Sequence, residues 1–193
     1  MTAAIGTTEP TGLQPRWLDA QEKRTWLALL AMINMIDDEL DRQLQRDSGM
    51  PHAYYMVLAA LSESPGRKMR MSDLASSNNA SQSRLTHAVN RLVIAGWVRR
   101  EKCTNDRRVV YAVLTDEGYD VLKEAAPGHV EAVRSTLFDR LSPQQVRQLR
   151  EISETVIAGS GSPPFWPRPD GAVGEADGEA RDGAHIAESC EQD

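Results

Sequence analysis

The chain has 193 residues, of which 40% are hydrophobic and 26% are charged, and its formal net charge is −6 at neutral pH. This length and composition fit one globular domain with appendages and leave no room for two large domains that share a catalytic cleft. No apolar run is long enough to cross a bilayer, and the segment before residue 15 lacks a signal-peptide pattern, so we expect a soluble, cytoplasmic protein without membrane contact.

The first part of the chain is predicted to be helical. After an arm at residues 1–18, which we expect to be flexible, residues 19–46 place apolar side chains at helical spacing without a glycine or proline. A second helix is expected after the break at residues 48–51, and it should end before Ser64-Pro65-Gly66. A short strand is then expected at residues 68–71.

The middle of the chain is predicted to form a helix-turn-helix followed by a β-hairpin. Ser72 is expected to cap a brief helix, after which Asn78-Asn79 supply residues that tolerate the left-handed conformation in a tight turn. Ser81 is expected to cap a second helix that Gly96 ends. Residues 97–103 and 108–114 are rich in β-branched and aromatic side chains, and the polar turn at residues 104–107 joins them.

The last part of the chain is predicted to hold two more helices. Thr115 is expected to cap a helix that runs toward Leu141, with a kink or break at Pro127-Gly128. The run Ser142-Pro143-Gln144-Gln145 has the pattern of a capping box, and its helix should end near Ala158. Residues 159–193 are too poor in large apolar groups to offset the entropy of ordering, so we expect a disordered acidic tail.

These elements define the expected fold class, which is mainly α with a small β-hairpin wing (α+β). The winged helix-turn-helix occupies about residues 50–114, within a domain of residues 19–158. Charge is concentrated in this region: residues 67–108 hold ten Lys or Arg against three acids, whereas residues 159–193 hold two Arg against eight acids. Local charge is what a phosphate backbone senses, so the basic region is a candidate nucleic-acid surface despite the negative total.

One face of the helix at residues 81–95 is suited to DNA. Short polar and basic side chains on a helix can reach base edges and phosphates in the major groove. The candidates are Ser81, Gln82, Ser83, Arg84, Thr86, His87 and Arg91. The same stripe could be a solvated helix face, which is the common fate of charged stripes on small domains. The basic hairpin tip with Arg107 and Arg108 favours DNA, because it offers a second projection that can reach a minor groove.

Two linked motifs resemble the MarR family of transcription regulators. One is Asp106-Arg107-Arg108 followed by a strand and then Leu114-Thr115-Asp116-Glu117-Gly118; the other is the stretch at residues 81–92 with Gly96-Trp97-Val98-Arg99-Arg100. The resemblance spans about residues 19–158 and implies a sequence-specific regulator of transcription. We expect a repressor, because a dimer that spans a promoter most simply blocks the polymerase. The resemblance also implies a homodimer, formed by the helices at about residues 19–46 and 115–158, on a pseudo-palindromic site in double-stranded DNA.

The resemblance assigns roles to three wing residues. Arg108 would enter the minor groove, Asp106 would hold it in position through an ion pair, and Arg107 would contact a phosphate. The pair Pro127-Gly128 departs from the family pattern, because the family usually keeps this helix uninterrupted. The alternative function is a winged helix that binds a protein partner, or DNA without sequence preference, and that lacks a ligand response.

The resemblance also implies release from DNA by a small aromatic or phenolic effector. Candidate pocket residues near the first two helices are Trp17, Trp26, Met32, His52, Tyr55 and Met56. The alternative, which is the more common role of such side chains, is that each of them is a core or dimer contact. Cys103 and Cys190 lack the spacing of a metal site or disulfide framework, so we expect reduced thiols, no metal and no cofactor. The four scattered histidines and the absence of a nucleophile motif argue against an enzyme.

Overall fold

The structure is a computed structural model that describes residues 15–78, 80–103, 106 and 108–159. Several sequence predictions fall outside these residues: the arm before residue 15, Asn79, most of the hairpin turn with Arg107, and the acidic tail from residue 160 onward. Among the described residues, no helix is long and apolar enough to span a membrane.

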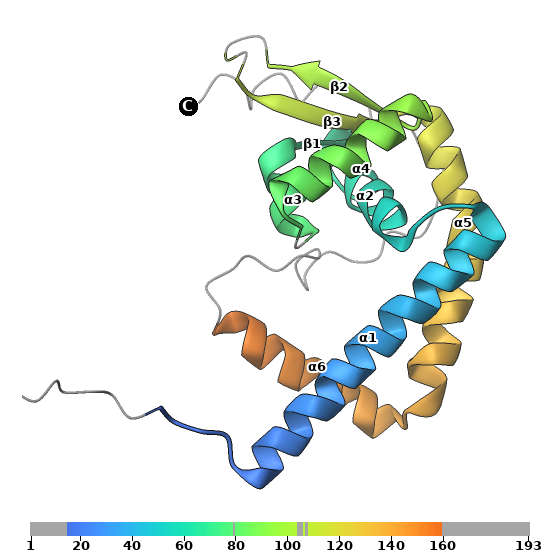
Figure 1. Ribbon diagram of the computed structural model, residues 1–193. Helices are drawn as coiled ribbons and strands as arrows, with labels where there is room; N and C mark the ends of the chain where they lie inside the picture. Colours follow the sequence, from blue (N-terminus) through green and yellow to red (C-terminus); the bar gives the residue numbers. More distant parts are fainter. Residues whose placement is uncertain (1–14, 79, 104–105, 107, 160–193) are drawn as a thin grey trace, which may run out of the picture. The chain divides into compact units, whose positions relative to one another are not determined.

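The described chain is mostly helical with one small antiparallel sheet, which confirms the predicted fold class (Figure 1). The sheet has the order β1-β3-β2, so the predicted hairpin gains a third strand, and Met69 pairs with Ala112 across it. In chain order the elements are α1 (Ala20–Ser48), α2 (His52–Ser62), η1 (Pro65–Arg67), β1 (Lys68–Arg70), α3 (Met71–Ser77), α4 (Gln82–Ile94), β2 (Val98–Lys102), β3 (Val110–Leu114), α5 (Asp116–Thr136), η2 (Phe138–Arg140) and α6 (Pro143–Ala158).

The chain divides within α1 into two units, residues 1–35 and 36–193. In the first unit Asp19 caps α1, because its carboxylate accepts hydrogen bonds from the backbone N–H groups of Gln21 and Glu22 at 2.7 and 2.8 Å. Glu22 completes a reciprocal cap by accepting from the Asp19 N–H at 2.8 Å. This part of α1 leaves large apolar side chains exposed, Trp26 among them.

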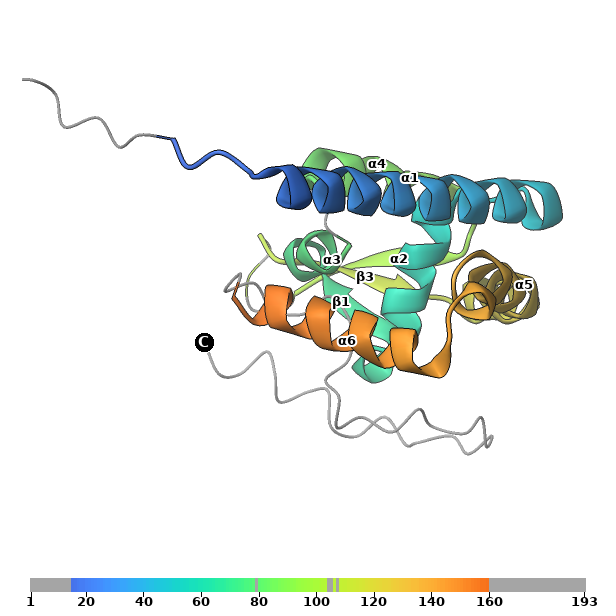
Figure 2. The ribbon, with the colours of Figure 1, turned by 90° about the horizontal axis from the view of Figure 1, so that it is seen from below.

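The core of the second unit lies between the sheet and three helices. Helices α2, α3 and α4 contact the strands and lie on one face of the sheet (Figures 1 and 2). The largest fully buried side chains are Met50 and six leucines contributed by the end of α1 and by α2, α3 and α4: Leu44, Leu58, Leu61, Leu74, Leu85 and Leu92. Such burial is the main source of stability of the helix-turn-helix, at about 1.5–3 kcal/mol per large side chain.

Helix α5 continues through Pro127 and ends at Thr136, before the predicted end near Leu141. The predicted break at Pro127-Gly128 is therefore wrong. Proline removes one backbone hydrogen bond and crowds the preceding turn. Residues on both sides of it hold the helix, because Ala125 is buried in the core and the His129 ring packs on Tyr55 of α2 at 4.2 Å between centroids.

The turn of the helix-turn-helix also differs in detail from the prediction. Helix α3 begins at Met71 with Arg70 at its N-cap, so Ser72 lies inside the first turn and its hydroxyl bonds Asp73. The cause is that β1 runs directly into α3 and buries Met71 at the first helical position. Asn78 is not left-handed, with φ of −92°. Gly96 does adopt the predicted left-handed conformation after α4, with φ of +82°.

Candidate nucleic-acid interface

Helix α4 has one buried face and one exposed face. Its cap is the predicted one, because the Ser81 hydroxyl accepts a hydrogen bond from the Arg84 N–H at 3.3 Å. The buried face consists of Leu85, Ala88, Val89 and Leu92. The other face leaves Ser81, Gln82, Ser83, Arg84, His87 and Arg91 exposed and Thr86 half-buried. The polar side chains predicted to face DNA are therefore accessible on one helix.

The wing holds an arginine in a fixed geometry. The Arg108 guanidinium donates to both carboxylate oxygens of Asp106, each at 3.1 Å, and the Arg108 backbone N–H donates to Oδ1 at 2.9 Å. The hydrogen bonds from the Arg108 side chain lower the pKa of Asp106, and the same contacts raise the pKa of Arg108. The Arg108 side chain is nevertheless 92% exposed, so its cation is oriented and still available to a partner.

The root of the wing is fixed by a close contact between backbones. The Thr115 N–H donates to the Trp97 carbonyl at 3.0 Å, and its hydroxyl donates to the Gly96 carbonyl at 2.8 Å and accepts from the Gly118 N–H at 3.0 Å. A Cβ on Gly118 would lie 2.1 Å from the Trp97 carbonyl oxygen, so a side chain does not fit there. This geometry gives a physical reason for the Leu-Thr-x-x-Gly pattern at the end of the hairpin.

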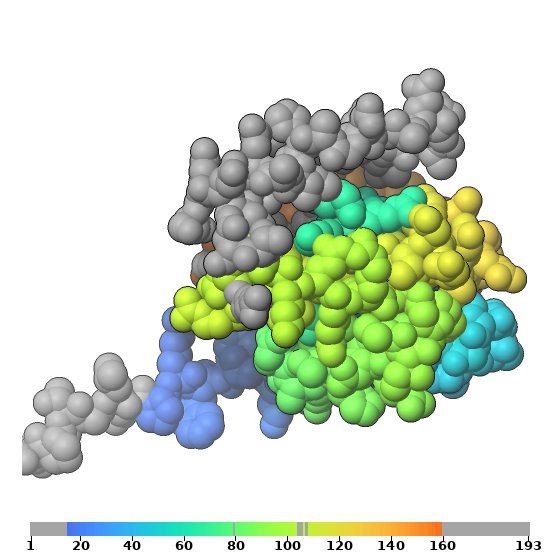
Figure 3. Space-filling view, turned by 90° about the horizontal axis from the view of Figure 1, so that it is seen from above, coloured from blue at the N-terminus to red at the C-terminus, as the bar shows by residue number. Residues whose placement is uncertain are grey.

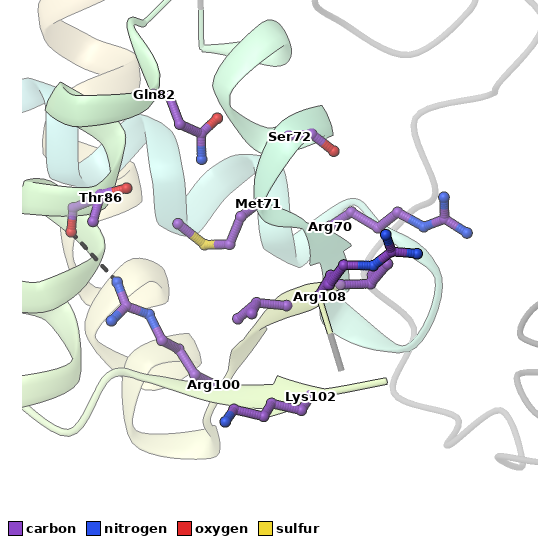
Figure 4. A pocket seen from close by; sticks show the side chains of 10 residues that line it. Arg70, Met71, Ser72, Gln82, Thr86, Arg100, Lys102 and Arg108 are labelled. Atoms are coloured by element: carbon purple, nitrogen blue, oxygen red, sulfur yellow. Dashed lines mark hydrogen bonds between the residues drawn. The ribbon is translucent and has the colours of Figure 1, made fainter. Parts of the chain in front are cut away.

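A cleft of about 620 Å³ lies between α4 and the wing, and we call it the wing cleft (Figure 4). Its lining combines four cations, an apolar floor and short polar groups: Arg70, Arg100, Lys102 and Arg108, then Met71, Val109 and Val110, then Ser72, Gln82 and Thr86. The Arg100 guanidinium reaches from β2 to the Thr86 carbonyl on α4, at 3.4 Å. No carboxylate is among the described residues that line the cleft.

The wing cleft brings together some of the predicted site residues. Gln82 and Thr86 from α4 line it with Arg108 from the wing, whereas Ser83, His87 and Arg91 are exposed on α4 outside it. The sequence prediction did not single out Arg70, Arg100 and Lys102. Residues two apart on a strand share one face, so the pair Arg100 and Lys102 was the signal for a basic face on β2. Figure 3 looks onto the side of the molecule that carries this wing.

Other basic residues of the region stabilise the fold. Arg67 donates to Asp116 at 3.1 Å and lies over the Tyr119 ring at 3.7 Å from its centroid. Lys68 bonds Glu101 at 2.7 Å, and Arg99 pairs with the same carboxylate. The positive charge counted along the sequence is thus divided among internal pairs, the wing cleft and the exposed face of α4 with Arg84 and Arg91.

Three of the residues proposed for an effector pocket lie in the first unit. Trp17 is 83% exposed, Met32 is half-buried, and Trp26 lines a hollow along α1 with Leu18 and Leu29. The structure therefore brings Trp26 together with other residues of α1 and its N-terminal flank.

The other three lie in the second unit. His52 and Met56 line a cavity of about 410 Å³ with Asp37, Asp41 and Arg84, whereas Tyr55 is buried in the core. The His52 N–H donates to Asp41 at 2.8 Å, and the His52 ring pairs with Asp37 at 2.9 Å. Only part of the predicted pocket thus surrounds one cavity.

His129 is a half-buried residue between α5 and α2. Its ring lies 4.2 Å from that of Tyr55 and 5.5 Å from that of His52. Burial, aided by the charge of His52, lowers the pKa of His129 to about 4. At neutral pH the ring is therefore uncharged and acts as a packing group.

Comparison with known proteins agrees with this architecture. The model of the MarR family matches residues 48–109. Sco3205, a MarR family transcriptional regulator from Streptomyces coelicolor solved in complex with DNA, has a TM-score of 0.72 and 52% identity, and the match covers 77% of this chain and 92% of that one. AbsC, a MarR family transcriptional regulator from the same organism, has a TM-score of 0.69 and 37% identity, over 75% and 97% of the two chains.

A curated relative is more distant. The transcriptional repressor MprA of Escherichia coli is 24% identical over 116 residues, which is 60% of this chain and 65% of MprA. The chain therefore spans slightly less than two thirds of that relative's length.

Proposed function

The chain belongs to the MarR family of transcriptional regulators, and from this premise we propose that it is a repressor that binds a specific sequence in double-stranded DNA. The observation that carries the proposal is the wing cleft, which joins polar groups of α4 to four cations. DNA binding by Sco3205, which was solved in complex with DNA, and the name of MprA as a repressor support it.

We propose that α4 reads the major groove while Arg108 enters the adjacent minor groove. The exposed side chains of α4, from Gln82 to Arg91, are the candidates for base and phosphate contacts. Asp106 holds the Arg108 guanidinium in place before DNA arrives, which reduces the entropy lost on binding. Arg107 remains a proposed phosphate contact, and it lies outside the described residues.

We propose that the protein acts as a homodimer on a pseudo-palindromic operator. Large apolar side chains are exposed on α1 and α6, namely Trp26, Leu27, Leu29, Leu30 and Ile33 on α1 and Ile152, Val156 and Ile157 on α6. Clusters of this kind on a monomer mark an interaction surface, and a second copy would cover them. Sedimentation should show a dimer at micromolar concentration; a monomer would contradict this part of the proposal.

We further propose that a small aromatic or phenolic effector controls DNA binding. The supporting feature is the 410 Å³ cavity at His52 and Met56, because Arg84 of α4 also lines it. An occupant of this cavity would touch α4 directly. Addition of a hydroxybenzoate should release labelled DNA, and His52→Ala should raise the concentration required; an unchanged DNA affinity at saturating probe would exclude this class of effector.

The test of DNA binding is an anisotropy titration against DNA that flanks the gene, with random DNA as competitor. Arg108→Ala should weaken binding by roughly tenfold to a hundredfold. It should also reduce the slope of log K against log salt by about 0.9 for each lost phosphate contact. Arg42→Ala is the matched control, since Arg42 is an exposed arginine on α1 that pairs with Glu39.

Binding that random DNA competes away equally well would refute a sequence-specific regulator. A salt-insensitive interaction would instead indicate the alternative, a winged helix that binds a protein partner.

A further inference from the structure

We propose that the acidic segment at residues 160–193 binds the wing cleft and competes with DNA for it. This inference rests on the proposed function only in naming DNA as the competitor. The binding of the segment to the cleft is inferred independently, from the charged and apolar residues of the segment and of the cleft.

Two of the cations that line the wing cleft, Arg100 and Lys102, form no ion pair with an acid among the described residues. Arg100 and Lys102 project from the same side of β2 into the cleft. The described acids of the hairpin pair with other cations than these two, because Glu101 bonds Lys68 and Asp106 holds Arg108. The cleft is therefore a site for an anion.

The acidic segment has the matching composition. Residues 160–193 contain eight Asp or Glu against two Arg, and four of the acids, Glu175, Asp177, Glu179 and Asp182, fall within a run of eight residues. The segment also carries the adjacent aromatic pair Phe165 and Trp166. Aromatic side chains can pack on the apolar floor of the cleft, and carboxylates can pair with its cations.

The length of the segment allows it to reach the cleft. Residues 160–193 follow directly on Gly159, just after α6, and 34 residues can extend over at most about 120 Å. The longest helix, α1 with 29 residues, measures about 44 Å at 1.5 Å per residue. Covalent attachment raises the local concentration of such a segment to the order of 1 mM. At this concentration, even a site with a dissociation constant of about 0.1 mM would be mostly occupied by the segment.

Occupancy by the segment should appear as weaker DNA binding by the full chain. With an effective concentration of the order of 1 mM and a site affinity near 0.1 mM, a chain that ends at Gly159 should bind DNA about tenfold more tightly. The gain should shrink as salt rises toward ~0.5 M, because screening weakens the contact between segment and cleft. Glu175→Gln with Asp177→Asn and Glu179→Gln should reproduce most of the gain at full length.

The decisive experiment compares amide NMR spectra of the full chain with those of the chain ending at Gly159, at low salt and without DNA. All described helices and strands remain in the shorter chain. The proposal predicts shift differences confined to the wing cleft, around Thr86, Arg100 and Val110, and their loss when salt or DNA is added. The triple variant should have the spectrum of the shorter chain at these positions.

Superimposable spectra would overturn the proposal, even if the shorter chain bound DNA more tightly. In that case the segment would only repel DNA from a distance. Failure of both chains to bind DNA would refute the proposed function instead, and the spectra would still report whether the segment occupies the cleft.

Discussion

Replacing Gly118 by alanine should unfold the wing junction at a cost that the structure defines. The new Cβ would lie 2.1 Å from the Trp97 carbonyl oxygen and 2.8 Å from its carbon, both of them backbone atoms. To remove this clash, the backbone at Gly118 or Trp97 must shift by more than 1 Å, since ordinary contacts lie beyond about 3.4 Å. That shift breaks the hydrogen bonds of Thr115 to Trp97 and Gly96 and of Gly118 to Thr115.

Three net hydrogen bonds at about 1 kcal/mol each predict a loss of ~3 kcal/mol in the free energy of unfolding. With a typical urea m-value of 1–3 kcal/mol/M, the urea midpoint followed by circular dichroism should fall by roughly 1–3 M. The comparison needs one fixed protein concentration, because dimer formation would couple unfolding to dissociation.

Gly128→Ala is the matched control in the same helix. Its Cβ would meet two side-chain atoms, the Gln43 Nε2 at 3.0 Å and the Asp47 Oδ2 at 3.7 Å, beside a cavity of about 480 Å³ that can take the displaced amide. Alanine gains up to ~1 kcal/mol over glycine inside a helix, so this variant should be neutral or slightly more stable. A Gly118→Ala protein within ~0.5 kcal/mol of the original, or an equal loss in Gly128→Ala, would refute the reasoning.

Three further predictions concern the cleft, the buried histidine and the last helix. Arg100→Ala should lower the salt slope of DNA binding by about 0.9 per lost contact, whereas Arg99→Ala, whose guanidinium pairs with Glu101, should leave the slope nearly unchanged in the same titration. Because the folded pKa of His129 is about 4 against 6.5 for the free side chain, the unfolded chain takes up the proton first. Its contribution is complete above pH 6.5 and is lost as pH falls toward 4. After discounting for partial solvent exposure, this loss in the free energy of unfolding is about 1–2 kcal/mol. Urea midpoints measured at several pH values should show the decline in the original protein, and His129→Phe should lack it. Ser142→Ala removes the capping box with Gln145 and should cost ~1 kcal/mol in urea unfolding; an unchanged midpoint would exclude a stabilising role for this cap.

The sequence predicted best what depends on neighbours along the chain. Ser81, Thr115 and Ser142 were each identified as helix caps, and in the structure each hydroxyl accepts a backbone N–H three residues on. The acceptor and the donor of a cap lie within one helical turn, so no knowledge of the fold is needed. Gly96 was predicted for the same reason, from the local need for a positive φ.

The errors arose where distant residues decide the local outcome. Pro127 did not break α5, because Ala125 and His129 pack on the core from both sides of it. A strand was predicted at residues 68–71, but its pairing with β3, which sets Lys68 opposite Val113, was not, because no short-range pattern reports such a pairing. A count of charges likewise could not show that Arg67 lies over Tyr119 while Lys102 lines the wing cleft.

The wing and α4 are joined by a short connection and by several hydrogen bonds. Helix α4 passes into β2 within a few residues, through Gly96 and Trp97, and Thr115 and Gly118 hold that junction against the start of α5. Arg100 adds a bond from β2 back to the Thr86 carbonyl. A displacement of α4 by an occupant of the cavity at Arg84 would therefore be expected to move the proposed major-groove and minor-groove contacts together. The hydrogen bonds of this junction are the physical link for such a response.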